Sequence, residues 1–235
     1  SEIKAILKVP SLEKQLDVNG LYTNYLWQQS TDHATCFKHI NSLAPGTYLK
    51  IDLVAQNTST HTYWDTLQLT QLQRTNTTIE HIEELLHQIV KKQLKAVVPI
   101  ISMLSGGIDS TTLSAIAKKY KPDLASYTLA LNEQHYNELP QAKAIASHLK
   151  LQAHIQELHA DDLLRDLDAS LTHFEAPYTS IEPVVLAARF MHDQQFKVVI
   201  NGIGADELFG GYQYYQRIYQ WERLNHFSWM ANFIA

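Results

Sequence analysis

The sequence is poor in cysteine, in basic residues and in long apolar runs. Its 235 residues include one cysteine, Cys36, so neither an internal disulfide nor a thiolate metal cluster is possible. The 24 acidic and 19 basic residues give a net charge of −5, which leaves no basic excess for a nucleic-acid backbone. No run approaches the roughly 20 apolar residues that cross a bilayer. These absences predict a soluble, cytoplasmic protein that binds neither nucleic acid nor membrane.

What the chain does contain is an alternation of strand and helix patterns from residue 77 onward. Apolar residues recur at helical spacing over residues 77–94. Short apolar runs bounded by turns then predict strands at 97–104, 124–131, 153–158 and 196–202. Helices are predicted between them, at 111–119, 141–149, 161–174 and 182–194. This order predicts a doubly wound α/β fold, in which helices cover both faces of a parallel sheet and ligands bind at the carboxyl ends of the strands.

The first 65 or so residues carry weaker patterns. An imperfect helical rhythm covers residues 12–29, and two alternating runs, 45–53 and 59–65, predict a β-hairpin. Because an isolated hairpin is only marginally stable in water, we expect this region to be stabilised by packing against another part of the protein.

The stretch "SGGIDS", residues 105–110, follows one predicted strand and precedes a helix. Gly106 and Gly107 permit a tight turn whose backbone N–H groups would face an anion, assisted by the hydroxyls of Ser105 and Ser110. A lysine would occupy this region of a Walker A loop, whereas here it holds Asp109. A carboxylate attracts phosphate only through a shared cation, so the stretch predicts a loop for a Mg²⁺-bound pyrophosphate and cleavage of ATP between its α and β phosphates. The alternative is a turn whose glycines serve packing alone.

A second glycine turn, "NGIGADELFGGYQYY" at residues 201–215, also follows a predicted strand. Asp206 would supply another carboxylate to the same Mg²⁺ if its strand neighbours that of Asp109. The alternative is a helix start at which Asp206 and Glu207 complement the helix dipole.

Both turns resemble known motifs. "SGGIDS" is similar to the pyrophosphate loop of the N-type ATP pyrophosphatases, and residues 201–215 resemble the signature of the asparagine synthetase family. The resemblance implies an adenine nucleotide alpha hydrolase-like fold and an ATP-dependent ligase of the amidotransferase type. Such an enzyme adenylates a carboxylate, aspartate or a related acid, releases pyrophosphate, and transfers ammonia derived from glutamine to form the amide. ATP and Mg²⁺ are the implied cofactors.

The resemblance also implies the site. Asp109 and Asp206 would hold the metal, and with Glu207 they form the implied catalytic set. Glu175, with residues 177–179, resembles a substrate-side segment, although an ordinary loop role is the better explanation for any one of these residues. Met103 and Leu129 are equally well explained as core residues. The implied nucleotide-binding residues are Met103, Leu104, Ser105, Gly106, Gly107, Asp109, Ser110, Leu129, Asn201 and Gly202.

The resemblance assigns residues 1–70 to the end of a glutaminase domain and its linking hairpin, and 71–235 to a synthetase domain truncated at its C-terminus. The resemblance also implies that the glutaminase half is absent from this sequence. Apolar residues near the C-terminus are expected to pack against a partner surface, which would be missing chain, the core or a second subunit in a homodimer. Ile203 stands where the family has glutamate. Either the acid differs from aspartate or another group performs the task of that glutamate, as in ligases for peptides, sugars or β-lactams. The other alternative is a nucleotide-binding module without ligase turnover.

Overall fold

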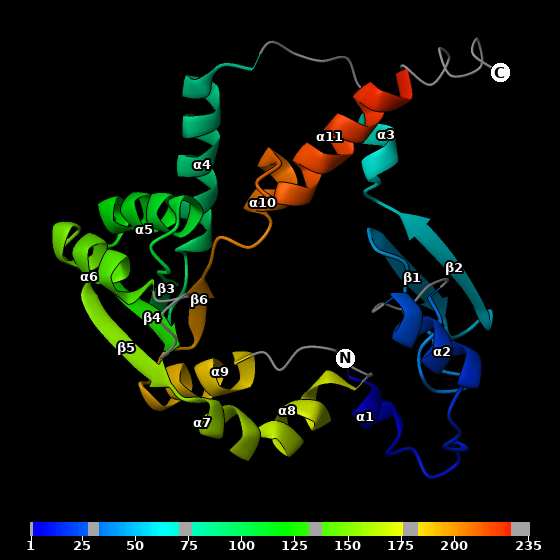
Figure 1. Ribbon diagram of the computed structural model, residues 1–235. Coiled ribbons are helices and arrows are strands. Elements are labelled where there is room, and N and C mark those ends of the chain that lie inside the picture. Colours follow the sequence, from blue (N-terminus) through cyan, green and yellow to red (C-terminus); the bar gives the residue numbers. More distant parts are fainter. Residues whose placement is uncertain (1, 28–32, 71–76, 132–137, 176–182, 227–235) are drawn as a thin grey trace. The chain divides into compact units, whose positions relative to one another are not determined.

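The computed structural model describes residues 2–27, 33–70, 77–131, 138–175 and 183–226 (Figure 1). The chain forms two compact units. One contains Ser1–Thr78 and His159–Ala188, and the other contains Ile79–Leu158 and Arg189–Ala235. The predicted domain boundary between residues 70 and 71 falls at the edge of segment 71–76, outside the described residues.

The second unit is built on a four-stranded parallel sheet. Its strands are β3 (Ile100–Met103), β4 (Ala125–Leu131), β5 (Gln152–Leu158) and β6 (Val198–Ile200), in the order β5-β4-β3-β6. After β3 the chain moves outward through β4 to β5, and later returns to place β6 on the other side of β3. The strand order therefore reverses between β3 and β6, which is where open α/β sheets bind ligands.

Helices cover both faces of this sheet, as the sequence predicts. Figure 1 shows α4 (Ile79–Gln93), α5 (Ile108–Tyr120) and α6 (Leu139–His148) together on one side. On that side, the buried hydroxyls of Ser102 in β3 and Ser114 in α5 lie 2.7 Å apart in a hydrogen bond. On the other side, Phe190 from the C-terminal half of α9 (Val184–Asp193) packs on Tyr127 of β4, with 5.5 Å between ring centroids. The predicted doubly wound α/β class is confirmed.

The core of the second unit lies between the sheet and the helices α4, α5 and α6. Alternate residues of each strand point into it because successive side chains of a strand face opposite ways. Burying them supplies the main stabilising free energy, about 25 cal/mol for each Å² of apolar surface. The buried cluster is Val90, Ile100, Leu104, Ile116, Ala117, Leu124, Ala142, Ala146, Leu151 and Ile200.

The first unit contains the predicted hairpin and several short helices. Strands β1 (Thr47–Asp52) and β2 (Asn57–Thr62) pair in antiparallel register, with Tyr48 opposite His61. Their rings stack at 5.0 Å between centroids. The helices that lie wholly in the described part of this unit are α1 (Ile3–Ile6), α2 (Val18–Trp27), α3 (Thr66–Thr70), α7 (Ala160–Arg165) and α8 (Leu167–Phe174).

Several predicted boundaries differ from the structure. The helix expected at 161–174 is divided into α7 and α8 at Asp166, whose φ of −99° and ψ of 8° interrupt the helical backbone. The helix expected at 111–119 begins three residues earlier, at Ile108, so Asp109 and Ser110 lie in its first turn. The sequence patterns did not predict α1 or α3. In the described part of the chain, no helix combines the length and apolar character needed to span a membrane.

Candidate functional site

A cavity of about 800 Å³ opens at the carboxyl ends of β3, β4 and β6 in the second unit. Its volume falls in the range of about 300–1,000 Å³ that is usual for small-molecule sites. Both glycine turns reach it, as the strand order requires. Its lining consists of Met103, Leu104, Ser105, Gly107, Asp109, Ser110, Tyr127, Leu129, Glu138, Gln141, Asn201, Gly202, Ile203, Gly204, Asp206 and Tyr212.

The first glycine turn is anchored to the sheet at its start. The Leu104 N–H donates to the Tyr127 carbonyl over 2.8 Å, and the Thr128 hydroxyl donates to the Leu104 carbonyl over 2.8 Å. Gly106 then takes a φ of 96°, and an added Cβ would stand 2.9 Å from the Cβ of Gln141 in α6. Glycine is needed here because both the backbone angle and the space exclude a side chain.

Two serine hydroxyls tie this turn together. The Oγ atoms of Ser105 and Ser110 lie 2.9 Å apart, and the Ser110 Oγ also accepts the Ser105 N–H at 3.2 Å. The Gly107 N–H reaches the Ser105 Oγ at 3.2 Å. Gly107 is the N-cap of α5, and no side chain among the described residues caps that end. The free N–H groups of the first helical turn, together with the positive end of the helix dipole, therefore suit an anion in the cavity.

The second turn is held by a side-chain hydrogen bond and a glycine with a positive φ. The Asn201 side-chain oxygen accepts the Ile203 N–H at 3.2 Å, and Gly204 takes a φ of 97° before the short helix α10 (Ala205–Phe209). Asp206 occupies the first turn of α10 and lines the cavity. After Gly210 and Gly211 the chain enters α11 (Gln213–His226).

The two turns touch. A Cβ added at Gly202 would lie 3.1 Å from the Cβ of Asp109 and 3.3 Å from the backbone nitrogen of Ser110. As a result, Asp109 and Asp206 line the same cavity. The described residues contain no group of three or more histidine, cysteine, aspartate or glutamate side chains that could hold a metal alone. Two carboxylates beside an anion site nevertheless fit Mg²⁺, which proteins commonly bind through one or two carboxylates plus substrate phosphates.

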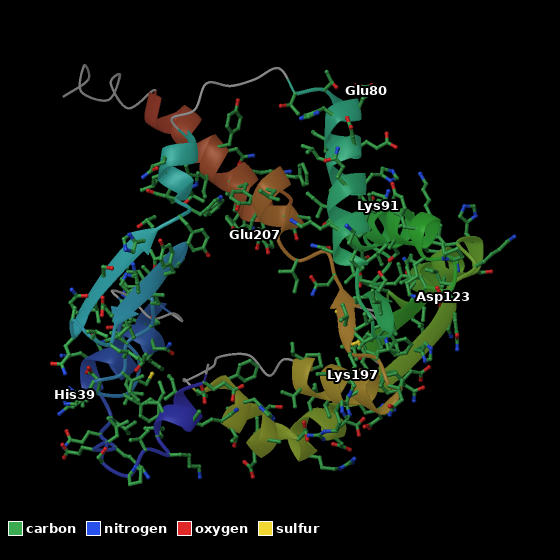
Figure 2. All side chains as sticks on the ribbon, turned by 180° about the vertical axis from the view of Figure 1, so that it is seen from behind. His39, Glu80, Lys91, Asp123, Lys197 and Glu207 are labelled. Carbon is green, nitrogen blue, oxygen red and sulfur yellow. The ribbon has the colours of Figure 1, made fainter. Side chains whose placement is uncertain are left out.

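Glu207 differs from the other two predicted acids. It lies on α10 (Figure 2), but it is not among the described residues that line the cavity. Its carboxylate accepts a 2.8 Å hydrogen bond from the Tyr212 hydroxyl. That bond, with smaller contributions from burial and from the charges of Glu207 and Asp206, raises the pKa of Tyr212. The Tyr212 phenol is therefore a hydrogen-bond donor at neutral pH.

The structure places nearly all of the predicted nucleotide-binding residues on the cavity wall. Gly106 is the exception, since its contacts are with α6. The lining also includes Glu138 and Gln141, which the sequence patterns did not single out. Their place at the start of α6, which follows β4, would have been the signal. Ile203 lines the cavity with 86% of its surface exposed.

Glu175, from the segment that resembles a substrate-side one, binds backbone groups at the start of the chain. It ends α8 in a left-handed conformation, and its carboxylate accepts the backbone N–H groups of Ile3 and Lys4 at 2.8 and 2.7 Å. These contacts join the two stretches of the first unit. The bond from Lys4 is the largest cause of a lowered pKa for this carboxyl group. Residues 177–179 lie outside the described residues.

Comparison with known proteins gives a consistent family. A family model described as asparagine synthase matches residues 81–233. Asparagine synthetase [glutamine-hydrolyzing] 1 of Bacillus subtilis is 25% identical over 219 residues, which cover 92% of this chain and 34% of that protein. A putative asparagine synthetase [glutamine-hydrolyzing] of Mycobacterium tuberculosis is 32% identical over 139 residues, covering 58% of this chain and 21% of that protein.

Among solved structures, an NH3-dependent NAD synthetase from Campylobacter jejuni aligns with a TM-score of 0.40 and 20% identity, over 58% of this chain and 61% of that one. The chain spans about a third or less of the length of the two asparagine synthetases named above. The family match extends over more than half of the chain and includes both glycine turns. This chain belongs to the asparagine synthase family.

Proposed function

We propose that this chain carries the synthetase site of an ATP-dependent ligase, which converts a carboxylate into its amide. One observation supports this most strongly: two glycine turns from separate strands meet at a single cavity, and each contributes an aspartate to its wall. We propose aspartate or a related acid as the substrate. The proposed source of ammonia is glutamine, because the relatives are named as glutamine-hydrolyzing.

The first glycine turn binds the outer phosphates in this proposal. The free N–H groups at the start of α5 and the hydroxyls of Ser105 and Ser110 donate hydrogen bonds to phosphate oxygens. Asp109 and Asp206 would hold Mg²⁺. Bound Mg²⁺–ATP supplies an α-phosphorus that the substrate carboxylate attacks, with pyrophosphate as the leaving group and AMP displaced when ammonia forms the amide.

The other end of the nucleotide would lie against the strand ends. Met103 and Leu129 offer apolar surface there, and Leu104 is held in place by its backbone bonds to β4. Asn201 and Gly202 also line the cavity. A planar base fits such a slot because apolar side chains cover its faces while backbone groups are available to its edge.

A second candidate is a ligase for a different acid, and the exposed Ile203 favours it. Isoleucine can neither bind a metal nor transfer a proton, and it presents an apolar surface to the cavity. The charged residues in the described lining, Asp109, Glu138 and Asp206, are all acidic. An acid with an uncharged, apolar far end would contact Ile203 without meeting these negative charges.

The test is AMP and pyrophosphate formation by the full-length protein across a panel of acids that includes aspartate and apolar monocarboxylates. We expect Asp109→Asn and Asp206→Asn to lower AMP formation by about 100-fold or more, because charge-stabilising groups at such sites are worth that much. Asp123→Asn is the control, since Asp123 lies just before β4, at the opposite end of the strands (Figure 2). Release of ADP instead of AMP would contradict the proposal.

The same panel of acids distinguishes the other candidate functions. A preference for apolar acids favours the second candidate, and Ile203→Ala should then lower kcat/KM for the best acid by about tenfold. ATP binding without AMP from any acid would indicate a nucleotide-binding module. The division of the chain into a glutaminase remnant (1–70) and a synthetase domain (71–235), and a homodimeric state, stay predictions.

A further inference from the structure

The segment Gly210–Tyr212 turns the chain back onto α10. Gly210 ends the helix with a φ of 70°, a left-handed conformation that glycine adopts without strain. The N–H groups of Gly210 and Gly211 both point to the carbonyl of Asp206, and the Gly211 bond measures 3.0 Å. The segment is thereby fixed over the turn of helix that carries the two acids.

Gly211 lies directly against the Asp206 side chain. A Cβ added at Gly211 would overlap the Asp206 Oδ1 and would lie 3.0 Å from its Cγ. At Gly210, by contrast, an added Cβ would meet nothing within 4 Å. Gly211 therefore leaves room for the carboxylate in its present position, and any larger residue would displace it.

Tyr212 acts on the neighbouring acid. Its hydroxyl donates to the Glu207 Oε1 at 2.8 Å, so the Glu207 carboxylate, which is not among the described lining residues, is engaged by a residue that is. Its ring is held in turn by the start of α11. The Tyr214 ring stacks on it at 5.3 Å with an interplanar angle of 15°, and the Tyr215 ring lies at 6.0 Å.

We propose that Gly210–Tyr212 is a positioning segment for the acid pair: Gly211 leaves the space that the Asp206 carboxylate occupies on the cavity wall, and Tyr212 engages Glu207 in a hydrogen bond. The inference rests on the proposed function, which assigns Asp206 to the metal. Because consecutive helical residues point about 100° apart, Glu207 could approach a cation beside Asp206 only by leaving its hydrogen bond with Tyr212 and changing its side-chain conformation. Because the number of carboxylate ligands sets both affinity and selectivity between Mg²⁺ and Ca²⁺, the segment determines which ion the site accepts.

The first test compares two methyl groups in one turn. Gly211→Ala places its methyl on Asp206, whereas Gly210→Ala adds only backbone strain. In the full-length protein with a non-hydrolysable ATP analogue, we expect Gly211→Ala to weaken Mn²⁺ binding, measured by electron paramagnetic resonance, by about 10- to 100-fold. Gly210→Ala should change it by less than about threefold, even if its melting temperature falls further. Equal effects of the two variants on Mn²⁺ would overturn the role of Gly211.

The second test removes only the Tyr212 hydroxyl. Tyr212→Phe keeps the ring and frees Glu207, so we expect Ca²⁺ to bind about fivefold or more tightly relative to Mg²⁺, since Ca²⁺ accepts more carboxylate ligands. The double variant Tyr212→Phe with Glu207→Gln should return the Ca²⁺ to Mg²⁺ ratio to that of the unmodified protein. An unchanged ratio in Tyr212→Phe, or a double variant that stays shifted, would overturn the role of Tyr212.

These measurements are separate from the test of the ligase reaction. If the unmodified protein binds Mn²⁺ with the ATP analogue but forms no AMP, the proposed function fails and the metal comparisons still decide the positioning role. If it forms AMP and pyrophosphate while all four variants bind metal as it does, the positioning role fails and the proposed function stands.

Discussion

Gly202 of the second glycine turn lies against Asp109 of the first, so closely that a Cβ on Gly202 would stand 3.1 Å from the Asp109 Cβ. Residues more than ninety positions apart in sequence thus share one van der Waals contact. The contact exists because β6 pairs directly with β3, which places the two turns at adjacent strand ends.

Gly202→Ala tests this contact. The added methyl group must push the two turns apart by a few tenths of an ångström, and we expect AMP formation to fall by about tenfold, because misplacement by about 1 Å can cost a hundredfold. Gly204→Ala adds no contact within 4 Å but strains a backbone with a φ of 97°, so comparing the rate and melting temperature of the two variants separates turn spacing from backbone strain. An unchanged rate in Gly202→Ala would show that the spacing of the turns does not limit the reaction.

Two serines on α5 should separate binding from stability. The Ser110 hydroxyl organises the first turn at the cavity, so Ser110→Ala should weaken pyrophosphate binding, measured by calorimetry, by about tenfold, the equivalent of one lost hydrogen bond. Ser114 is fully buried, and Ser114→Ala removes its hydrogen bonds to the Ser102 hydroxyl and to the Ser110 carbonyl, but leaves the Ser110 hydroxyl in place. That variant should lose about 1–3 kcal/mol of unfolding free energy while keeping pyrophosphate affinity. The reverse pattern would contradict these assignments.

Leu124 and Leu208 give a matched test of the core. Leu124 is fully buried in the main cluster, so Leu124→Ala should lower the free energy of unfolding by about 2–5 kcal/mol through lost burial and a residual cavity. Leu208 is 81% exposed, and Leu208→Ala should change it by less than about 0.5 kcal/mol. Denaturant titration measures both. Similar losses of unfolding free energy for the two variants would mean that the Leu208 side chain on α10 is buried in the intact protein.

Glu175 predicts a pH dependence of stability in the first unit. Hydrogen bonds from the Lys4 and Ile3 backbone lower the pKa of this carboxyl group below 4.5 in the folded state. As pH falls, the unfolded chain takes up the proton first, so stability is complete above the unfolded pKa and is lost as pH falls through the folded one.

Glu175→Gln removes this titration. The melting temperature of the unmodified protein should therefore fall more steeply between about pH 6 and about pH 3 than that of the variant. Parallel pH profiles for the two proteins would show that the carboxylate contributes nothing to holding residues 3 and 4.

Much of the fold and site follows from local sequence. Apolar alternation and helical spacing predict the four strands of the parallel sheet and the helices between them, since both periods are properties of the local backbone. The glycines of the two turns predict the position of the site, because turn formation is also a property of the local backbone. Asp109, Asp206 and most of the predicted nucleotide-binding residues do line the cavity. The division of residues 161–174 into two helices was not predicted, because a single backbone departure at Asp166 leaves the apolar spacing unchanged.

Sequence alone determined that two glycine turns, each with an acid, stand at the carboxyl ends of strands, because turn chemistry and periodicity are local. Only the tertiary structure decided which groups meet. Strand order β5-β4-β3-β6 puts Gly202 on Asp109, and the reversal after α10 sets Gly211 on Asp206 and turns Glu207 toward Tyr212. Such contacts depend on long-range strand pairing and on close backbone approach, and neither leaves a periodic signal in the chain.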